Sequence, residues 1–140
     1  MERILIFILL TILLNAQSIN FGNATVKEIT SIYDGDTFRA NIKDYPKIVG
    51  YRMPIRINGI DAPELKAKCI KEKKLARKAK QLTVSLLRGA KHIELKNIKR
   101  GKYFRLIADV YVDGKSLANE LLKAGYAVRY NGGKKKEWCK

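Results

Sequence analysis

The sequence predicts a small, mostly β domain with some helix, built as a five-stranded Greek-key barrel with two or three helices. A chain of 140 residues with 46% hydrophobic residues is long enough for one domain with a modest core. Short alternating segments predominate, and only one long stretch has helical periodicity. The predicted order, strand-strand-strand-helix-strand-strand-helix, fits such a barrel, although the order alone does not identify the topology.

Three strands are expected in the first half of the chain, at residues 24–33, 37–42 and 54–60. In the first strand Val26 and Ile29 are candidates for the core face, and the irregular spacing between them indicates a β-bulge. Asp34-Gly35 is expected to turn the chain into the second strand. Residues 44–52 contain a proline and a glycine, which predicts a loop before the third strand.

A long helix is expected at roughly residues 64–87, with Pro63 and Glu64 at its start and Gly89 closing it. Its apolar or small residues recur at helical spacing, at Cys69, Ala76, Ala79, Leu82 and Leu86. The rest of the helix is crowded with basic residues, which indicates a solvated face that attracts phosphate at long range.

Two further strands are expected, at residues 92–98 and 104–112, with Arg105 at the start of the second. Asp113-Gly114 is expected to form the turn that follows. Ser116 is a plausible N-cap for a short helix, and Gly125 fits the position just after its end.

The chain is strongly basic, with 29 Lys and Arg against 13 Asp and Glu, a net charge of +16 and a pI of about 10.0. Such an imbalance favours a polyanionic partner, with nucleic acid preferred over an anionic membrane surface. A purely structural or membrane-surface protein would leave two acidic clusters in the chain unexplained.

The N-terminus contains an apolar run, Ile4 to Leu14, interrupted only by Thr11. The run is too short to span a bilayer and suits a signal peptide, so residues 1–18 are expected to be removed and the protein secreted or periplasmic. The candidate cleavage sites follow Ala16, Ser18 or Ala24, and the Ser18 region is favoured. An uncleaved anchor and a buried first strand are the alternatives.

Cys69 and Cys139 are the only cysteines, and both fall in the part expected to be exported. An even pair in an oxidising compartment can form a disulfide, but two separate thiols fit the sequence equally well.

The acidic clusters are Asp34-Gly35-Asp36-Thr37 and Arg56-Ile57-Asn58-Gly59-Ile60-Asp61-Ala62-Pro63-Glu64. Either piece alone is more typical of turns than of a metal site. Together they supply carboxylates for a hard cation, a candidate base and a cation for a phosphoryl group. Carboxylate oxygens favour calcium or magnesium over zinc, and the sequence offers no His/Cys cluster for zinc.

With the later segment Lys102-Tyr103-Phe104-Arg105, these clusters resemble the staphylococcal nuclease family in content and order. That family has a DGDT-like turn, an R-x4-D-[TA]-P-E run and a Lys-Tyr-Gly-Arg-like segment. The resemblance covers roughly residues 24–139. It implies an OB-fold barrel and a metal-dependent nuclease acting on DNA and RNA, expected to be monomeric, not membrane-spanning and without a stable protein partner.

The resemblance also implies the roles of individual residues. Asp36, Asp61 and the backbone carbonyl of Ala62 would hold calcium, with magnesium as the alternative ion, and Asp34 would orient the loop. The family often has threonine where this chain has Ala62, but alanine keeps the carbonyl. The loop at residues 44–52 is longer than expected for the family and is expected to border the active site.

Glu64 is the expected general base on the attacking water, or alternatively the residue that positions it, because a neighbouring cation lowers the pKa of a glutamate and weakens it as a base. Arg56 and Arg105 would clamp the scissile phosphate with their rigid donor forks.

Contacts to phosphates and bases are expected from Lys102, Tyr103 and Tyr130. Phe104 departs from the family's glycine, which bears on substrate preference. The alternative function is a nucleic-acid-binding OB module without catalysis, which the presence of the whole catalytic set disfavours.

Overall fold

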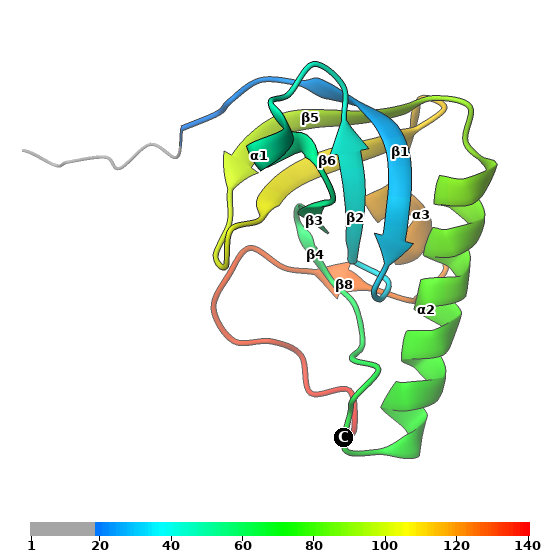
Figure 1. Ribbon diagram of the computed structural model, residues 1–140. Coiled ribbons are helices and arrows are strands. Elements are labelled where there is room, and N and C mark those ends of the chain that lie inside the picture. The colour runs from blue at the N-terminus through cyan, green and yellow to red at the C-terminus, as the bar shows by residue number, and fades with distance from the viewer. Residues whose placement is uncertain (1–18) are drawn as a thin grey trace, which may run out of the picture.

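The computed structural model describes residues 19–140, which form a closed five-stranded barrel with helices packed beside it (Figure 1). The barrel strands are β1 (Ala24–Ile32), β2 (Thr37–Ile42), β3 (Met53–Ile57), β5 (Ile93–Arg100) and β6 (Leu106–Val112). They are ordered β3-β2-β1-β5-β6, and parallel pairing of β3 with β6 closes the barrel. This is the predicted OB-fold. The expected signal peptide, residues 1–18, lies outside the described residues.

The remaining elements extend the barrel. Two short strands, β4 (Ile60–Asp61) and β8 (Val128–Arg129), pair with each other, and β7 (Lys115–Ser116) pairs with β6. The helices are α1 (Lys47–Gly50), α2 (Ile70–Gly89) and α3 (Leu117–Lys123). In the described part of the chain, no helix has the length and apolar character needed to span a bilayer.

The barrel core follows the alternation of the strands. Phe38 and Ala40 in β2 are fully buried, as are Ile55 in β3 and Ala108 in β6. The register of β1 against β2 shifts after Val26, which confirms the predicted bulge. The core therefore forms where period-two alternation places apolar side chains on one face.

The third strand is shorter than predicted, because it ends at Ile57 instead of continuing to Ile60. Gly59 has a φ of 80°, a conformation that favours glycine, and it turns the chain there. The following residues Ile60–Asp61 pair with β8 instead. Because of this turn, Asp61 belongs to β4 and not to a continuation of β3.

The long helix also begins later than predicted, at Ile70 rather than at Glu64. Cys69 precedes it in an extended conformation, and its Sγ accepts a hydrogen bond from the Glu72 backbone N–H at 3.4 Å. Of the two alternatives for the cysteines, the structure has the disulfide, with Cys69 bonded to Cys139. The N-cap of α2 is thus a residue held by the disulfide, and residues 64–69 form turns and bends before the helix.

The loop expected at residues 44–52 contains the four-residue helix α1. The expectation that this loop borders the site was wrong. Strand β2 begins beside Asp36 and ends at Ile42, so the loop follows at the opposite end of β2 (Figure 1).

Candidate active site

Three aspartates are buried at one end of the barrel, where β2 begins and β4 ends. Asp34 and Asp36 belong to the turn between β1 and β2, and Asp61 is the last residue of β4. Their exposed fractions are 5%, 3% and 2%. Buried carboxylates require hydrogen bonds or opposite charges to offset their lost hydration.

Arg56 supplies much of that compensation. It lies in β3 directly opposite Thr37 of β2, which brings it to the acidic turn. Its Nη1 lies 3.2 Å from Asp36 Oδ2, and its Nη2 lies 3.2 Å from Asp61 Oδ1. Burial alone would lower the pKa of Arg56, but Asp36 and Asp61 outweigh burial and raise it. The predicted trio of Asp36, Arg56 and Asp61 therefore meets in space.

Backbone amides hold the acidic turn in shape. The Asp36 N–H donates to Asp34 Oδ1 at 3.0 Å, and the Ala62 N–H donates to Asp36 Oδ2 at 2.8 Å. Asp34 thus accepts a hydrogen bond within the turn, and Ala62 lies next to Asp36. Burial, followed by the nearby charge of Asp36, raises the pKa of Asp34 to about 7.

Helix α2 packs against this turn at Gly35. Thr83 in α2 is fully buried, and its Oγ1 donates a hydrogen bond to the Gly35 carbonyl at 2.7 Å. A Cβ at Gly35 would lie 2.8 Å from Ala79 Cβ and 3.0 Å from Ala62 Cβ. Only glycine therefore lets the helix approach the turn this closely.

Glu64 lies at the rim of the site, with its side chain 51% exposed. Its Oε1 is 3.7 Å from the Nζ of Lys135, a residue that the sequence reasoning did not identify. The same Nζ lies 3.2 Å from Asp61 Oδ1. Burial would lower the pKa of Lys135, but Asp61, supported by Glu64, raises it against the opposing charge of Arg56. The only available signal was a lysine run close to Cys139.

Tyr130 also reaches the site. The Cζ atom of Arg56 lies 5.9 Å from the centroid of its ring, within the range of a cation–π contact. Its backbone N–H donates to the Gly59 carbonyl at 2.9 Å, which holds the segment after β8 against the turn before β4.

The remaining predicted residues lie in the turn between β5 and β6. The strand predicted from Phe104 begins instead at Leu106, because Tyr103 and Phe104 have φ values of 58° and 53° and form part of the turn. Lys102 and Tyr103 are exposed, and Tyr103 is 89% exposed. No ion pair or hydrogen bond joins these three residues to the acidic cluster in the described part of the chain.

Arg105 follows this turn, and its backbone is tied down by a bond from the Gly101 N–H to its carbonyl at 2.8 Å. Its Nε is buried and has no hydrogen-bond partner among the described residues. A buried donor without a partner is costly unless a ligand supplies the acceptor.

The donor set fits a hard divalent cation. Asp36 and Asp61 present carboxylate oxygens, the ligands that calcium and magnesium prefer. When ionised, Asp36, Asp61 and Glu64 carry three negative charges, against the two positive charges of Arg56 and Lys135, their ion-pair partners among the described residues. The cluster therefore keeps a net negative charge even when Asp34 is protonated, which favours a further cation. The cysteines offer no thiolate ligand, because both are in the disulfide.

A sequence model of the family described as staphylococcal nuclease homologue matches residues 54–138 of this chain. A curated relative from Phaeosphaeria nodorum, named probable endonuclease LCL3, is 32% identical over 95 residues. That alignment covers 64% of this chain and 32% of the relative, so the chain spans about a third of the relative's length. The family match includes Arg56, Asp61, Glu64 and Arg105. The chain belongs to the staphylococcal nuclease homologue family.

Proposed function

We propose that this protein is a metal-dependent nuclease that hydrolyses phosphodiester bonds in DNA and RNA. The observation that carries the proposal is the convergence of buried Asp36 and Asp61 on Arg56 at the end of an OB-fold barrel. Membership of the nuclease family and the endonuclease name of the relative support it. The net charge of +16 suits a polyanionic substrate.

Asp36 and Asp61, with the backbone carbonyl of Ala62, would hold calcium, or magnesium as the alternative. When bound, such an ion supplies positive charge that stabilises the phosphoryl oxygens in the transition state. Asp34 keeps the turn in place through its bond to the Asp36 N–H.

Glu64 accepts a proton from the attacking water, which approaches phosphorus opposite the leaving oxygen. Its exposed position at the rim leaves room for that water. Arg56 and Arg105 donate hydrogen bonds to the phosphoryl oxygens, where negative charge increases in the transition state. The bond from phosphorus to the 5′ oxygen breaks, and that oxygen takes a proton from solvent, giving a 5′-hydroxyl and a 3′-phosphate end.

The exposed turn before Arg105 and the Tyr130 ring serve substrate binding. Tyr130 and Tyr103 offer faces on which unpaired bases can stack with little sequence preference, and Lys102 adds a charge for phosphate. The protein acts as a monomer after export to the periplasm or the medium, with residues 1–18 removed as a signal peptide. N-terminal sequencing of the exported protein tests this processing and should begin between Gln17 and Thr25.

Digestion of plasmid and RNA with calcium, with magnesium and with excess chelator tests the activity. We expect cleavage with the divalent ion and none with chelator, and Asp36→Ala should abolish cleavage in a folded protein. The control is Glu120→Gln, which should retain full activity. Glu120 is an acidic residue on α3 that forms an ion pair with Lys123. Cleavage in chelator would refute the metal assignment, and nucleic-acid binding without cleavage under every condition would instead favour the non-catalytic OB module.

A further inference from the structure

Lys135 occupies the acidic site from outside the barrel. Its Nζ lies 3.2 Å from Asp61 Oδ1 and 3.7 Å from Glu64 Oε1, so one ammonium contacts both carboxylates. Asp61 is buried, whereas the side chain of Lys135 is 49% exposed. The ammonium can therefore move from the carboxylates into water at small cost, while Asp61 remains in need of a cation.

The segment that carries Lys135 is anchored at both ends. Before it, the Tyr130 backbone N–H donates to the Gly59 carbonyl. After it, Trp138 is buried and Cys139 is bonded to Cys69 at the start of α2. The residues between, 131–137, are exposed and contain neither helix nor strand. A short tether of this kind keeps the ammonium at a high effective concentration near the site.

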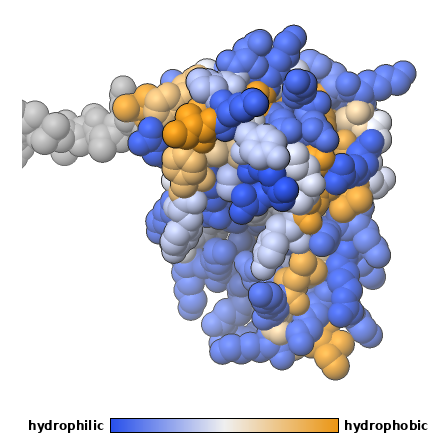
Figure 2. All heavy atoms as spheres, in the orientation of Figure 1, coloured by the Kyte–Doolittle hydropathy of each residue, from blue (hydrophilic) through white to orange (hydrophobic). Residues whose placement is uncertain are grey.

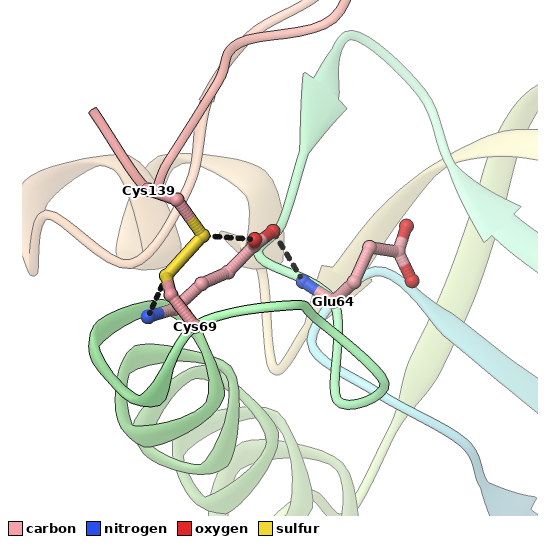
Figure 3. Close-up of a disulfide and its surroundings, with 4 residues drawn as sticks. Glu64, Cys69 and Cys139 are labelled. Atoms are coloured by element: carbon pink, nitrogen blue, oxygen red, sulfur yellow. Dashed lines mark hydrogen bonds between the residues drawn. A yellow bond between two sulfur atoms is a disulfide. The ribbon is translucent and has the colours of Figure 1, made fainter.

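The disulfide is also connected to Glu64 through hydrogen bonds of Glu72 (Figure 3). Cys69 caps α2 by accepting from the Glu72 N–H, and Glu72 Oε1 accepts from the Glu64 backbone N–H at 3.2 Å. Glu72 is itself buried. The Cys69 cap therefore supports the backbone of Glu64 through Glu72, and the bridge from Cys69 to Cys139 anchors the segment that carries Lys135.

We propose that Lys135, held by the Cys69–Cys139 disulfide, is an intramolecular competitor of the divalent cation for the metal ligand Asp61, with Glu64 as its second carboxylate contact. This inference rests on the metal site proposed above. The carboxylate oxygens cannot serve the ammonium and a divalent ion fully at once, so binding of the ion displaces Lys135. The tether thus sets the cation concentration at which the site fills.

Calcium binding, measured by titration calorimetry on the purified protein without nucleic acid, tests the proposal. Lys135→Met keeps the length of the side chain but removes its charge, and we expect about tenfold tighter calcium binding. Lys135→Arg restores a cation and should return the affinity towards that of the wild type. Lys134→Met is the matched control, since it removes one charge from the exposed neighbouring position and should leave the affinity within about twofold.

The role of the disulfide is tested with the double variant Cys69→Ser, Cys139→Ser. Serine is a good N-cap, so α2 should keep its start, while the segment that carries Lys135 loses its anchor. We expect tighter calcium binding, as with Lys135→Met, and no further gain when both changes are combined. A thermal melt establishes that each variant is folded at the temperature of the titration.

The outcomes separate this inference from the proposed metal site. Equal calcium affinity in the wild type, Lys135→Met and Lys134→Met would overturn the competition and leave the metal site standing. Looser binding in Lys135→Met would show that Lys135 supports the site, which also overturns it. If the wild type bound no more calcium than Asp61→Asn, the metal site would fall, and the competition with it. A gain in Lys135→Met without one in the serine variant would overturn only the role of the disulfide.

Discussion

Arg56 is the residue that links the parts of the candidate site, because its two terminal nitrogens contact aspartates from two different elements. Those ion pairs hold the guanidinium in one orientation before substrate arrives. A donor that is already oriented loses little freedom when negative charge develops on the phosphoryl group. The Nε of Arg105 is also a buried donor, and it has no hydrogen-bond partner among the described residues.

We expect Arg56→Ala and Arg105→Ala each to reduce kcat by about two to three orders of magnitude, as loss of a transition-state donor does. Steady-state kinetics on a defined oligonucleotide measures this change. Arg39→Ala is the matched control and should leave kcat unchanged. Arg39 is an exposed β2 arginine whose side chain, among the described residues, forms a hydrogen bond only to the Arg52 carbonyl, at 3.4 Å. If Arg56→Ala or Arg105→Ala raised KM alone, the arginine would be a binding group and its assigned role would be wrong.

Asp34 should make the stability of the metal-free protein depend on pH. Its pKa is raised from 3.8 to about 7 in the folded state, so between these values the folded protein binds the proton that the unfolded chain releases. The contribution of Asp34 to the free energy of unfolding should therefore decrease as pH rises from about 4 to 7. Asp34→Asn can still accept from the Asp36 N–H and does not ionise.

Denaturant unfolding in chelator, measured at a series of pH values, tests this expectation. The loss of stability between about pH 4 and 7 should be smaller in Asp34→Asn than in the wild type. An identical pH dependence in the two proteins would show that Asp34 does not titrate in this range.

At the scale of elements, the position of the acidic turn depends on α2. Gly35 lies against Ala79 of the helix, and Thr83 binds the Gly35 carbonyl. Helix α2 is in turn capped by Cys69, which the disulfide holds. The helix therefore supports the acidic turn and also carries basic residues.

We expect Gly35→Ala to reduce the free energy of unfolding by about 1–3 kcal/mol, because the added Cβ would meet Ala79 Cβ at 2.8 Å. It should also weaken calcium binding, since relief of the clash moves Asp34 and Asp36. Gly89→Ala is the matched control, because nothing lies within 4 Å of its added Cβ and its stability should not fall. Chemical denaturation measures both variants, and a Gly35→Ala protein as stable as the wild type would refute the close packing.

At the scale of the whole molecule, positive charge is spread widely over the surface. Lys71, Lys74 and Lys78 of α2 are exposed, as the sequence predicted for a solvated helix face. Hydrophilic residues cover much of the face seen in Figure 2, including much of the side along which α2 runs in Figure 1. None of the three lysines forms an ion pair with the acidic cluster within residues 19–140.

The affinity for nucleic acid should fall linearly with salt concentration on logarithmic axes, because bound lysines release counterions from the phosphates. Reversing Lys71, Lys74 and Lys78 to glutamate should weaken binding and lower that slope, while kcat at saturating substrate is retained. Binding titrations at several salt concentrations and initial rates at saturation provide the two readouts. Loss of kcat in a folded variant would mean that this face contacts the reacting groups and that the assigned site is incomplete.

Local chemistry allowed much of this protein to be predicted from its sequence. Strand β2 has the predicted bounds, Thr37–Ile42, because period-two alternation acts within one segment. The Asp113-Gly114 turn has positive φ at both residues, and Ser116 caps α3 by accepting from the Asn119 N–H, as predicted. The approach of Asp36, Arg56 and Asp61 could be expected only from the order of the motifs that resemble the family.

The tertiary structure decided what depends on contacts between distant residues. The sequence left the cysteines as a bridge or two thiols, and only the fold of the C-terminal segment brings Cys139 to Cys69. The disulfide-bonded Cys69 is also the N-cap of α2, which begins at Ile70 although Pro63 and Glu64 form a locally suitable helix start. In the sequence Lys135 is one lysine in a basic run, and only the tertiary structure shows that its ammonium contacts Asp61 and Glu64. Local patterns determine elements, whereas these contacts follow from chain closure and packing, which periodicity and motif spacing do not encode.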